Sequence, residues 1–448
     1  MKGKTMLVLA ALGAVPFIMV LGNSMLIPVL PEMQKELGIS QFKTSLVISL
    51  FSIPAGLVIP FAGFLSDRLG RKKVIAPALI IYGIGGAIAG AAALLMDKAY
   101  WLIITGRIVQ GIGAAGTAPV TMALVGDIFT SQERSKALGY IEASNGMGKV
   151  VSPILGSLIG IIAWFATFFV FPVLTIPIAL AVWFAVQEPK PRAGQQSIGQ
   201  YLGAIITIFK NKAGFLITAF LIGSLALLLL FGILFFLSDY LEKTLKLFAV
   251  KKGLVLAIPV LAMSVTSLTT GALIKKKVPL MKKLVLTGLS LITLTLGVLP
   301  FFTNPWANVG IMAGTGVGVG LILPCLNTLI TSSTSMQERG MITSLYGGVR
   351  FFGVAAGPPL FGFLDNFDGR FVIFWSSAAL ALAVGILALL LLPSKVQPQT
   401  AGPGQGEQND RKSPGMVFLE TVTLKNTIGR LVTKKPLRSP KTSPDKDK

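Results

Sequence analysis

The stretch GFLSDRLGRKK, residues 63–73, joins two long apolar segments and sets glycines, one acid and several bases at fixed spacing. Gly63 lets the end of the first segment approach a neighbouring helix closely, and Gly70 allows a tight turn. Asp67 can act on a nearby helix N-terminus or on an arginine. The bases suit an anionic membrane surface, and they are Arg68, Arg71, Lys72 and Lys73. The spacing Gly-x-x-x-Asp-Arg-x-Gly-Arg-Lys favours a specialised loop over an ordinary basic one.

The composition around this loop is that of a membrane protein. Of the 448 residues, 53% are hydrophobic and 13% charged, against about 25% charged in soluble proteins. The apolar runs hold roughly 20 residues each, enough to cross ~30 Å of hydrocarbon as helices, and they lack the alternation of β-barrel strands. Twelve spans are predicted, at 6–30, 43–65, 74–96, 101–125, 138–160, 164–187, 214–237, 252–274, 284–303, 306–330, 342–364 and 371–393.

An internal repeat divides these spans into two sets of six. A shift of 205 residues places SQER (131–134) on MQER (336–339). The same shift superposes glycines and prolines without a gap, and the pairs are Pro54 with Pro259, Gly111 with Gly316, Gly113 with Gly318, Pro119 with Pro324, Gly148 with Gly353 and Pro153 with Pro358. Two six-helix bundles of equal topology follow, related by a pseudo-two-fold axis along the membrane normal.

The predicted domains follow from this repeat. They are an N-terminal bundle (1–187), a cytoplasmic linker (188–213), a C-terminal bundle (214–393) and a disordered basic cytoplasmic tail (394–448).

The loop charges predict the orientation in the membrane. One set of loops carries 18 lysines and arginines and the opposite set eight, among them Lys251 and Lys252, so both termini are expected in the cytoplasm. The net charge of +22 then reflects contact with an anionic inner leaflet rather than with nucleic acid. The composition looks bacterial, which places the chain in the plasma membrane as a multi-pass protein.

Several chemistries are not expected. The chain contains one cysteine, Cys325, and no histidine, so an internal disulfide and a cysteine metal cluster are excluded and zinc or haem sites are disfavoured. No cofactor and no metal are predicted, and the protein is not expected to be an enzyme.

Four motifs together resemble the major facilitator superfamily, within it the twelve-helix drug:proton antiporters. The 63–73 loop resembles the superfamily signature. LGNSMLIPVLP (21–31) and IITGRIVQGIGAA (103–115) fit the first-span and fourth-span motifs. GYIEASNGMGKVVSPILGS (139–157) fits the fifth-span antiporter motif, carried by Gly139, Gly148, Ser152, Pro153 and Gly156. Ser152 and Ser157 stand where the family usually has glycine, and serine is still small enough for close packing.

The resemblance implies alternating access, with two halves rocking about a central cavity. It assigns the 63–73 loop as a conformational switch, with Asp67 as its switch residue beside Gly63, Arg68, Gly70, Arg71 and Lys72. The string EASNGMGK (142–149) is similar to a subgroup of multidrug exporters that includes metallophore exporters. The implied partners are a proton and a small-molecule substrate.

Charges inside the predicted spans indicate function, because burying one in the bilayer costs at least ~2.5–3.5 kcal/mol. Arg107, by the resemblance, serves proton coupling, although it could instead snorkel to the outer surface. Glu142 and Lys149 share a helix face about 10 Å apart, too far for a direct ion pair. Glu142 is the best-placed acid for a proton, or else an interfacial acid. Lys149 either senses negative charge on the substrate or holds Glu142 ionised.

The repeat places Arg350 opposite Asn145, so both halves offer polar groups to one cavity. The predicted substrate-binding residues are Asn23, Gln110, Asn145, Lys149, Asn327, Tyr346 and Arg350. Two or three cations suit an anionic or zwitterionic substrate. The sequence therefore predicts a monomeric, proton-coupled exporter of a drug or a metallophore. An importer or facilitator of an organic anion or sugar, and a receptor or scaffold signalling through the tail, stay open as alternatives.

Overall fold

A computed structural model of the chain describes residues 3–129, 131–188, 198–274, 277–333, 339–365, 370–393, 396–398 and 416–418. The first half contains α1 (Gly3–Ser24), the 3₁₀ turn η1 (Ile27–Val29), α2 (Leu30–Leu37), α3 (Gln41–Leu69), α4 (Arg71–Leu95), α5 (Tyr100–Ala115), α6 (Ala118–Ile128), α7 (Ser131–Gly160) and α8 (Ala166–Ala185). The second half contains α9 (Ile198–Lys243), α10 (Ala249–Ile274), α11 (Val278–Val298), η2 (Leu299–Phe301), α12 (Pro305–Ser333), α13 (Arg339–Leu364) and α14 (Arg370–Leu391).

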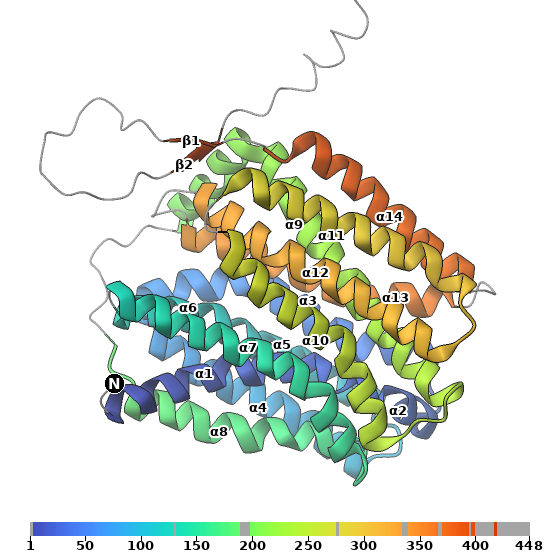
Figure 1. Cartoon of the computed structure of the whole chain (residues 1–448). Coiled ribbons are helices and arrows are strands. Elements are labelled where there is room, and N and C mark those ends of the chain that lie inside the picture. The colour runs from blue at the N-terminus through green and yellow to red at the C-terminus, as the bar shows by residue number, and fades with distance from the viewer. Residues whose placement is uncertain are drawn as a thin grey trace, which may run out of the picture.

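In the part of the chain that the structure describes, the helices make up twelve spans. These spans form the body of the molecule (Figure 1). Within the described residues, ten helical segments are long and apolar enough to cross a membrane. The other two spans are α7 and α13, which carry Glu142, Lys149 and Arg350 among many glycines and so have lower hydropathy. The all-α prediction with twelve spans is confirmed.

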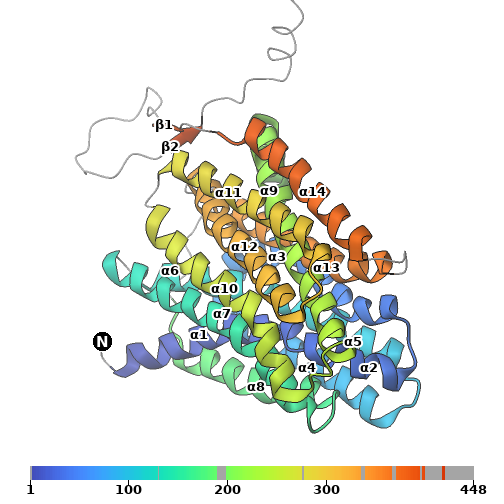
Figure 2. The same cartoon turned by 45° about the vertical axis from the view of Figure 1, so that its right-hand side comes forward.

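The 205-residue repeat is visible in the helix bounds. Shifting the range 100–128, which covers α5 and α6, by 205 residues reproduces the bounds of α12, Pro305–Ser333. The halves differ in one respect here: Gly116 and Thr117 interrupt the first-half span, whereas α12 runs without a break. Figure 2 shows the helices of the two halves as two groups packed side by side.

The halves meet through two helix pairs, α3 with α13 and α7 with α10. We call the end of the bundle around Glu36 the Glu36 end, and the opposite one the Arg71 end. Toward the Glu36 end, α10 lies against α7 so closely that a Cβ on Gly253 would be 2.7 Å from the Pro153 carbonyl oxygen. Toward the Arg71 end, Gly139 of α7 and Gly271 of α10 make no such contact: among the described residues nothing lies within 4 Å of either Cβ position.

Hydrogen bonds between the halves follow the same pattern. Among the described residues three such bonds are formed, each from a side chain to a backbone oxygen, and all lie toward the Glu36 end. They join Ser49 to Ala355 (2.6 Å), Ser238 to Ile27 (2.7 Å) and Lys252 to Pro28 (2.7 Å). The bundle is therefore closed at the Glu36 end.

Regular secondary structure also occurs inside the predicted linker and the predicted tail. Residues 198–211, predicted as linker, are helical and continue into α9 across a kink at Lys212 (φ −132°, ψ 22°). The apolar residues of IGQYLGAIITIF recur at helical spacing, which explains the extension. Inside the predicted tail, β1 (Val396–Pro398) pairs antiparallel with β2 (Met416–Phe418), with Val396 opposite Phe418. The rest of the tail lies outside the described residues.

Candidate functional site

Arg107 is fully buried in the middle of α5 and binds three neighbours at once. Its Nε donates to the Val47 carbonyl oxygen (2.8 Å), Nη1 to Gln110 Oε1 (2.5 Å) and Nη2 to Asn23 Oδ1 (2.7 Å). The planar guanidinium presents its donors as a fixed fork, which suits acceptors that come from three directions. The structure thus brings together three predicted site residues, Asn23, Arg107 and Gln110, where α1, α3 and α5 meet.

All three hydrogen-bond partners of Arg107 are neutral, and among the described residues it forms no ion pair. The Phe51 ring lies 4.4 Å from the guanidinium carbon, an attractive cation–π contact. Gln110 Nε2 is buried and has no hydrogen-bond partner within the described part of the chain. A buried cation without a counterion creates a field that favours an anion nearby. The alternative that Arg107 snorkels to the surface does not fit this burial.

Two further cations, one from each half, act on each other electrostatically. Lys149 on α7 and Arg350 on α13 are both half-buried and close enough to act on each other electrostatically, and Glu142 acts on Lys149 as well. The Arg350 guanidinium lies 5.0 Å from the centre of the Tyr346 ring, and its Nε is buried with no hydrogen-bond partner among the described residues. Two like charges from opposite halves therefore share one region.

The other residues predicted to line the cavity are less closely associated with Lys149 and Arg350. Asn145 is half-buried one turn before Lys149, while Glu142 and Asn327 are exposed. Within the described part of the chain, neither Glu142 nor Asn327 makes a side-chain hydrogen bond to Lys149 or Arg350. Glu142 is therefore open to water rather than locked in an ion pair.

The small residues of the 139–157 motif pack α7 against both halves. A Cβ on Gly148 would lie 3.0 Å from the Phe17 carbonyl oxygen, and one on Gly156 would overlap the Met25 carbonyl oxygen. Ser152 is fully buried, and Pro153 contacts α10 through its carbonyl. Gly139 differs, because nothing lies within 4 Å of its Cβ position.

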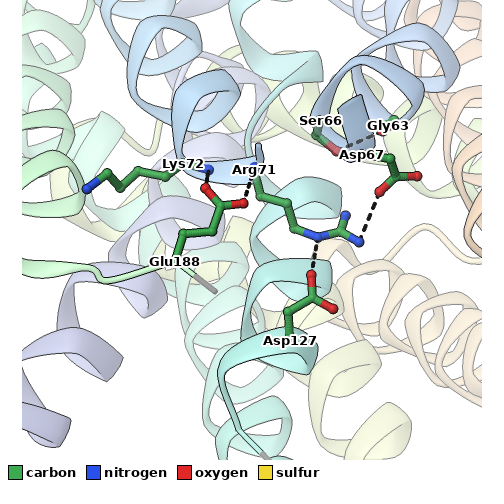
Figure 3. Close-up of polar contacts among 7 residues, drawn as sticks. All are labelled: Gly63, Ser66, Asp67, Arg71, Lys72, Asp127 and Glu188. Carbon is green, nitrogen blue, oxygen red and sulfur yellow. Dashed lines mark hydrogen bonds and ion pairs between the residues drawn. The ribbon is translucent and has the colours of Figure 1, made fainter. Parts of the chain in front are cut away.

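At the Arg71 end, Arg71 connects two acids from different helices (Figure 3). Its Nη2 lies 3.0 Å from Asp67 Oδ1, and its Nε lies 2.5 Å from Asp127 Oδ2 at the end of α6. Ser66 Oγ donates to the Gly63 carbonyl oxygen (2.7 Å), and a Cβ on Gly63 would lie 2.9 Å from Ser344 Oγ of α13. The predicted switch loop thus ties α3, α4 and α6 together beside the second half.

Glu188, just after α8, caps the N-terminus of α4. Its carboxylate accepts from the backbone N–H of Arg71 (2.5 Å) and of Lys72 (3.1 Å). Gly70 precedes them at φ 102°, and a Cβ there would lie 3.0 Å from Glu188 Oε2. A carboxylate at a helix N-terminus accepts hydrogen bonds from the free amides of the first turn, and its negative charge interacts favourably with the positive end of the helix dipole. Lys72 Nζ donates to the Val186 carbonyl oxygen (3.0 Å), so this lysine is bound within the protein.

The sequence matches the model of the Major Facilitator Superfamily over residues 12–358 and 282–441. The chain belongs to the major facilitator superfamily. With its membrane-spanning helices, it is a multi-pass plasma-membrane protein and a transporter rather than an enzyme.

Bacterial relatives within the superfamily are named as exporters or multidrug transporters. The chain is 41% identical over 387 residues to the bacillibactin exporter of Bacillus subtilis (strain 168), covering 86% of this chain and 96% of that one. It is 25% identical to multidrug resistance protein 1 of the same organism, over 86% of this chain and 96% of the relative. These names support an exporter-like group of drug or metallophore carriers.

Solved structures of the superfamily share the fold. A bacterial homolog of the human lysosomal transporter Spinster, in an inward-facing and unoccupied conformation, superposes with a TM-score of 0.67 at 14% identity, over 88% of this chain and 96% of that one. The human organic anion transporter MFSD10 gives 0.65 at 16% identity, over 87% of this chain and all of that one.

Two features of this superfamily member escaped the sequence analysis. Glu188 was not singled out, because its partners at residues 71 and 72 are over a hundred positions away; its only signal is an acid after a span. Lys252 was counted as a loop cation, yet the structure buries it where the halves meet. Nothing in its local sequence distinguishes it from the neighbouring Lys251.

Proposed function

We propose that this transporter exports a small anionic or zwitterionic molecule in exchange for protons by alternating access. A siderophore of the bacillibactin kind is the first substrate to test. The observation that carries the proposal is the electrostatic contact of Lys149 and Arg350 from opposite halves, together with the buried Arg107, whose three hydrogen-bond partners are neutral. Like charges held together are unfavourable unless something negative joins them.

An anion between the halves would bind both Lys149 and Arg350. Each charge-assisted hydrogen bond is worth about 1.5–3 kcal/mol, roughly ten- to a hundredfold in affinity. Because the two cations belong to different halves, the bound anion would couple substrate binding to the relative position of the halves. The 41% identity to a chain named for siderophore export supports a substrate of this charge.

The direction of transport follows from orientation. The excess of lysine and arginine at the Arg71 end favours a cytoplasmic position for that end. The bundle is closed at the Glu36 end, so in the proposed cycle this conformation would receive substrate from the cytoplasm. Rocking about the α3–α13 and α7–α10 contacts would then open the opposite side.

Glu142 is the proposed proton carrier. It is exposed on α7, acts on Lys149, and is the one acid within the predicted fifth span. Protonation would remove its charge and leave Lys149 free for the substrate, and release of the proton would reverse this. Arg107 is the second proposed coupling residue, and it would act through the electric field of its buried positive charge.

The decisive experiment measures collapse of a respiration-driven pH gradient in everted membrane vesicles on addition of iron-free bacillibactin. We expect collapse with the wild type and at least a tenfold weaker response with Lys149→Met. Lys98→Met is the matched control, because Lys98 is exposed in a loop outside the cavity. Collapse by Lys149→Met equal to that of the wild type would contradict the proposed substrate contact, and no collapse in either would contradict proton-coupled siderophore export.

Multidrug export is the second candidate. It is favoured by the relative named multidrug resistance protein 1, which covers 86% of this chain. The same vesicles distinguish the two: a lipophilic cation that collapses the gradient, with no response to anionic chelators, would select it.

A further inference from the structure

Lys252 is a buried lysine between the halves at the Glu36 end. It lies in the first turn of α10 and is 3% exposed. Its Nζ donates to the carbonyl oxygen of Pro28 in η1 (2.7 Å) and to Glu242 Oε2 at the end of α9 (2.7 Å). One ammonium thus joins a backbone oxygen of the first half to a carboxylate of the second. Figure 1 shows α2, α9 and α10 meeting at this end.

The surroundings of this ammonium are acidic. Asp239 and Glu32 also act on Lys252, Asp239 from α9 and Glu32 from α2 in the other half. Asp239 is itself paired with Lys243, four residues later on the exposed side of α9 (2.9 Å). Glu32 of the first half and Glu242 of the second act on each other as like charges, and Lys252 opposes that repulsion.

A buried ammonium is stable only while its partners hold it. In the closed arrangement Lys252 has two partners and almost no water. If the halves separate at this end, the Pro28 contact breaks and water reaches both Lys252 and Glu242. The bridge therefore favours the closed arrangement and has no role in the open one, which is the property of a lock.

We propose that Lys252, with Glu242 and the Pro28 carbonyl, is the positioning residue that locks the Glu36 end closed and sets how often that end opens. The lock consists of Lys252 with Pro28 and Glu242 at the Glu36 end, and neither partner belongs to the proposed substrate contacts Lys149 and Arg350. This inference rests on the proposed alternating access, because a lock at this end matters only if the end opens.

The test uses a cysteine reporter on the other helix pair. Cys325 is the only cysteine, so Cys325→Ala gives a cysteine-free background. Ser49→Cys is the reporter, because Ser49 is 2% exposed and its hydroxyl bonds Ala355 across the α3–α13 contact. A membrane-impermeant maleimide is applied to the Glu36 face of intact cells. We expect Lys252→Met to raise the labelling rate of this reporter about tenfold.

Two controls isolate the lock from general loosening. Lys243→Met removes a lysine of the same end, but Lys243 is 66% exposed and its partner Asp239 lies in its own helix, so labelling should stay within twofold. Ser344→Cys, beside Gly63 at the Arg71 end, should label from the opposite face and more slowly in Lys252→Met. A change of the population toward the open Glu36 end predicts these opposite responses, whereas unfolding would raise both.

Each outcome of the labelling experiment supports or overturns the lock. Labelling of Ser49→Cys in Lys252→Met at the parent rate overturns the lock, and gradient-driven transport by the same variant then shows whether alternating access still stands. If Lys252→Met does not accumulate in the membrane, Glu242→Gln is used in the same way. It removes the negative charge beside the ammonium but keeps the Pro28 contact between the halves, so it should raise labelling by less than Lys252→Met would; an unchanged rate overturns the proposal.

Discussion

Gly111 of α5 and Gly316 of α12, 205 residues apart, make the same kind of contact in the two halves. Each lies directly against a backbone carbonyl oxygen of the adjacent helix, that of Phe51 in α3 for Gly111 and that of Pro259 in α10 for Gly316. At both positions an added Cβ would overlap this oxygen, so only glycine lets the helix axes come this close.

Alanine at either glycine should therefore destabilise the fold. Because the obstacle is backbone and not a flexible side chain, Gly111→Ala and Gly316→Ala should each cost about 1–3 kcal/mol or more. Thermal unfolding in detergent would show a lower midpoint for both. Gly310→Ala is the matched control, since it lies in α12 with nothing within 4 Å of its Cβ position. An equal loss in the control would refute the packing argument.

Removing the Glu188 carboxylate should weaken the N-terminus of α4. Glu188→Ala loses two hydrogen bonds to backbone amides and a favourable charge at the helix dipole, about 1–3 kcal/mol together. We expect a lower unfolding midpoint and faster hydrogen exchange in the first turn of α4, read by mass spectrometry. Glu133→Ala, an exposed acid in the first turn of α7, is the control. Unchanged exchange at residues 71–75 would show that the cap contributes nothing.

Arg107→Lys should abolish most transport although the charge is kept. Lysine offers three donors on a flexible stem and cannot hold the acceptors of Val47, Gln110 and Asn23 together. With buried acceptors left unpaired, we expect at least a tenfold fall in substrate flux in vesicles at equal expression. Arg134→Lys, at an exposed position of α7, should transport normally. Normal flux in Arg107→Lys would mean that charge alone matters at this site.

The fold was largely predictable because the sequence repeats itself at a single shift of 205 residues. Glycines and prolines at 205-residue spacing predicted two equivalent halves, and the bounds of α12 agree with α5 and α6 under that shift. Apolar length alone would have found ten spans and missed α7 and α13, whose buried polar residues lower their hydropathy. The start of α9 lies within the predicted linker. It was not predicted as helix because the polar residues there make the helical spacing of Ile198, Leu202 and Ile205 hard to recognise.

The site was only partly predictable, since contacts between distant residues have no local signal. Asn23, Arg107 and Gln110 were chosen singly as polar residues in apolar helices, and the structure shows that they form one hydrogen-bonded group. Arg71 was expected in the switch loop, but its partner Asp127 lies 56 residues away. Lys251 and Lys252 look alike in sequence, and only packing separates an exposed lysine from a buried one.

Glu142→Gln tests which group carries the proton. Glutamine keeps the size and hydrogen bonding of glutamate but cannot take up a proton, so gradient-driven transport should fall at least tenfold. Substrate exchange without a pH gradient should persist, because Lys149 and Arg350 remain. Glu133→Gln, near the start of the same helix, serves as the control and should behave as the wild type. Full gradient-driven transport by Glu142→Gln would place the proton path elsewhere and leave Glu142 as a partner of Lys149 alone.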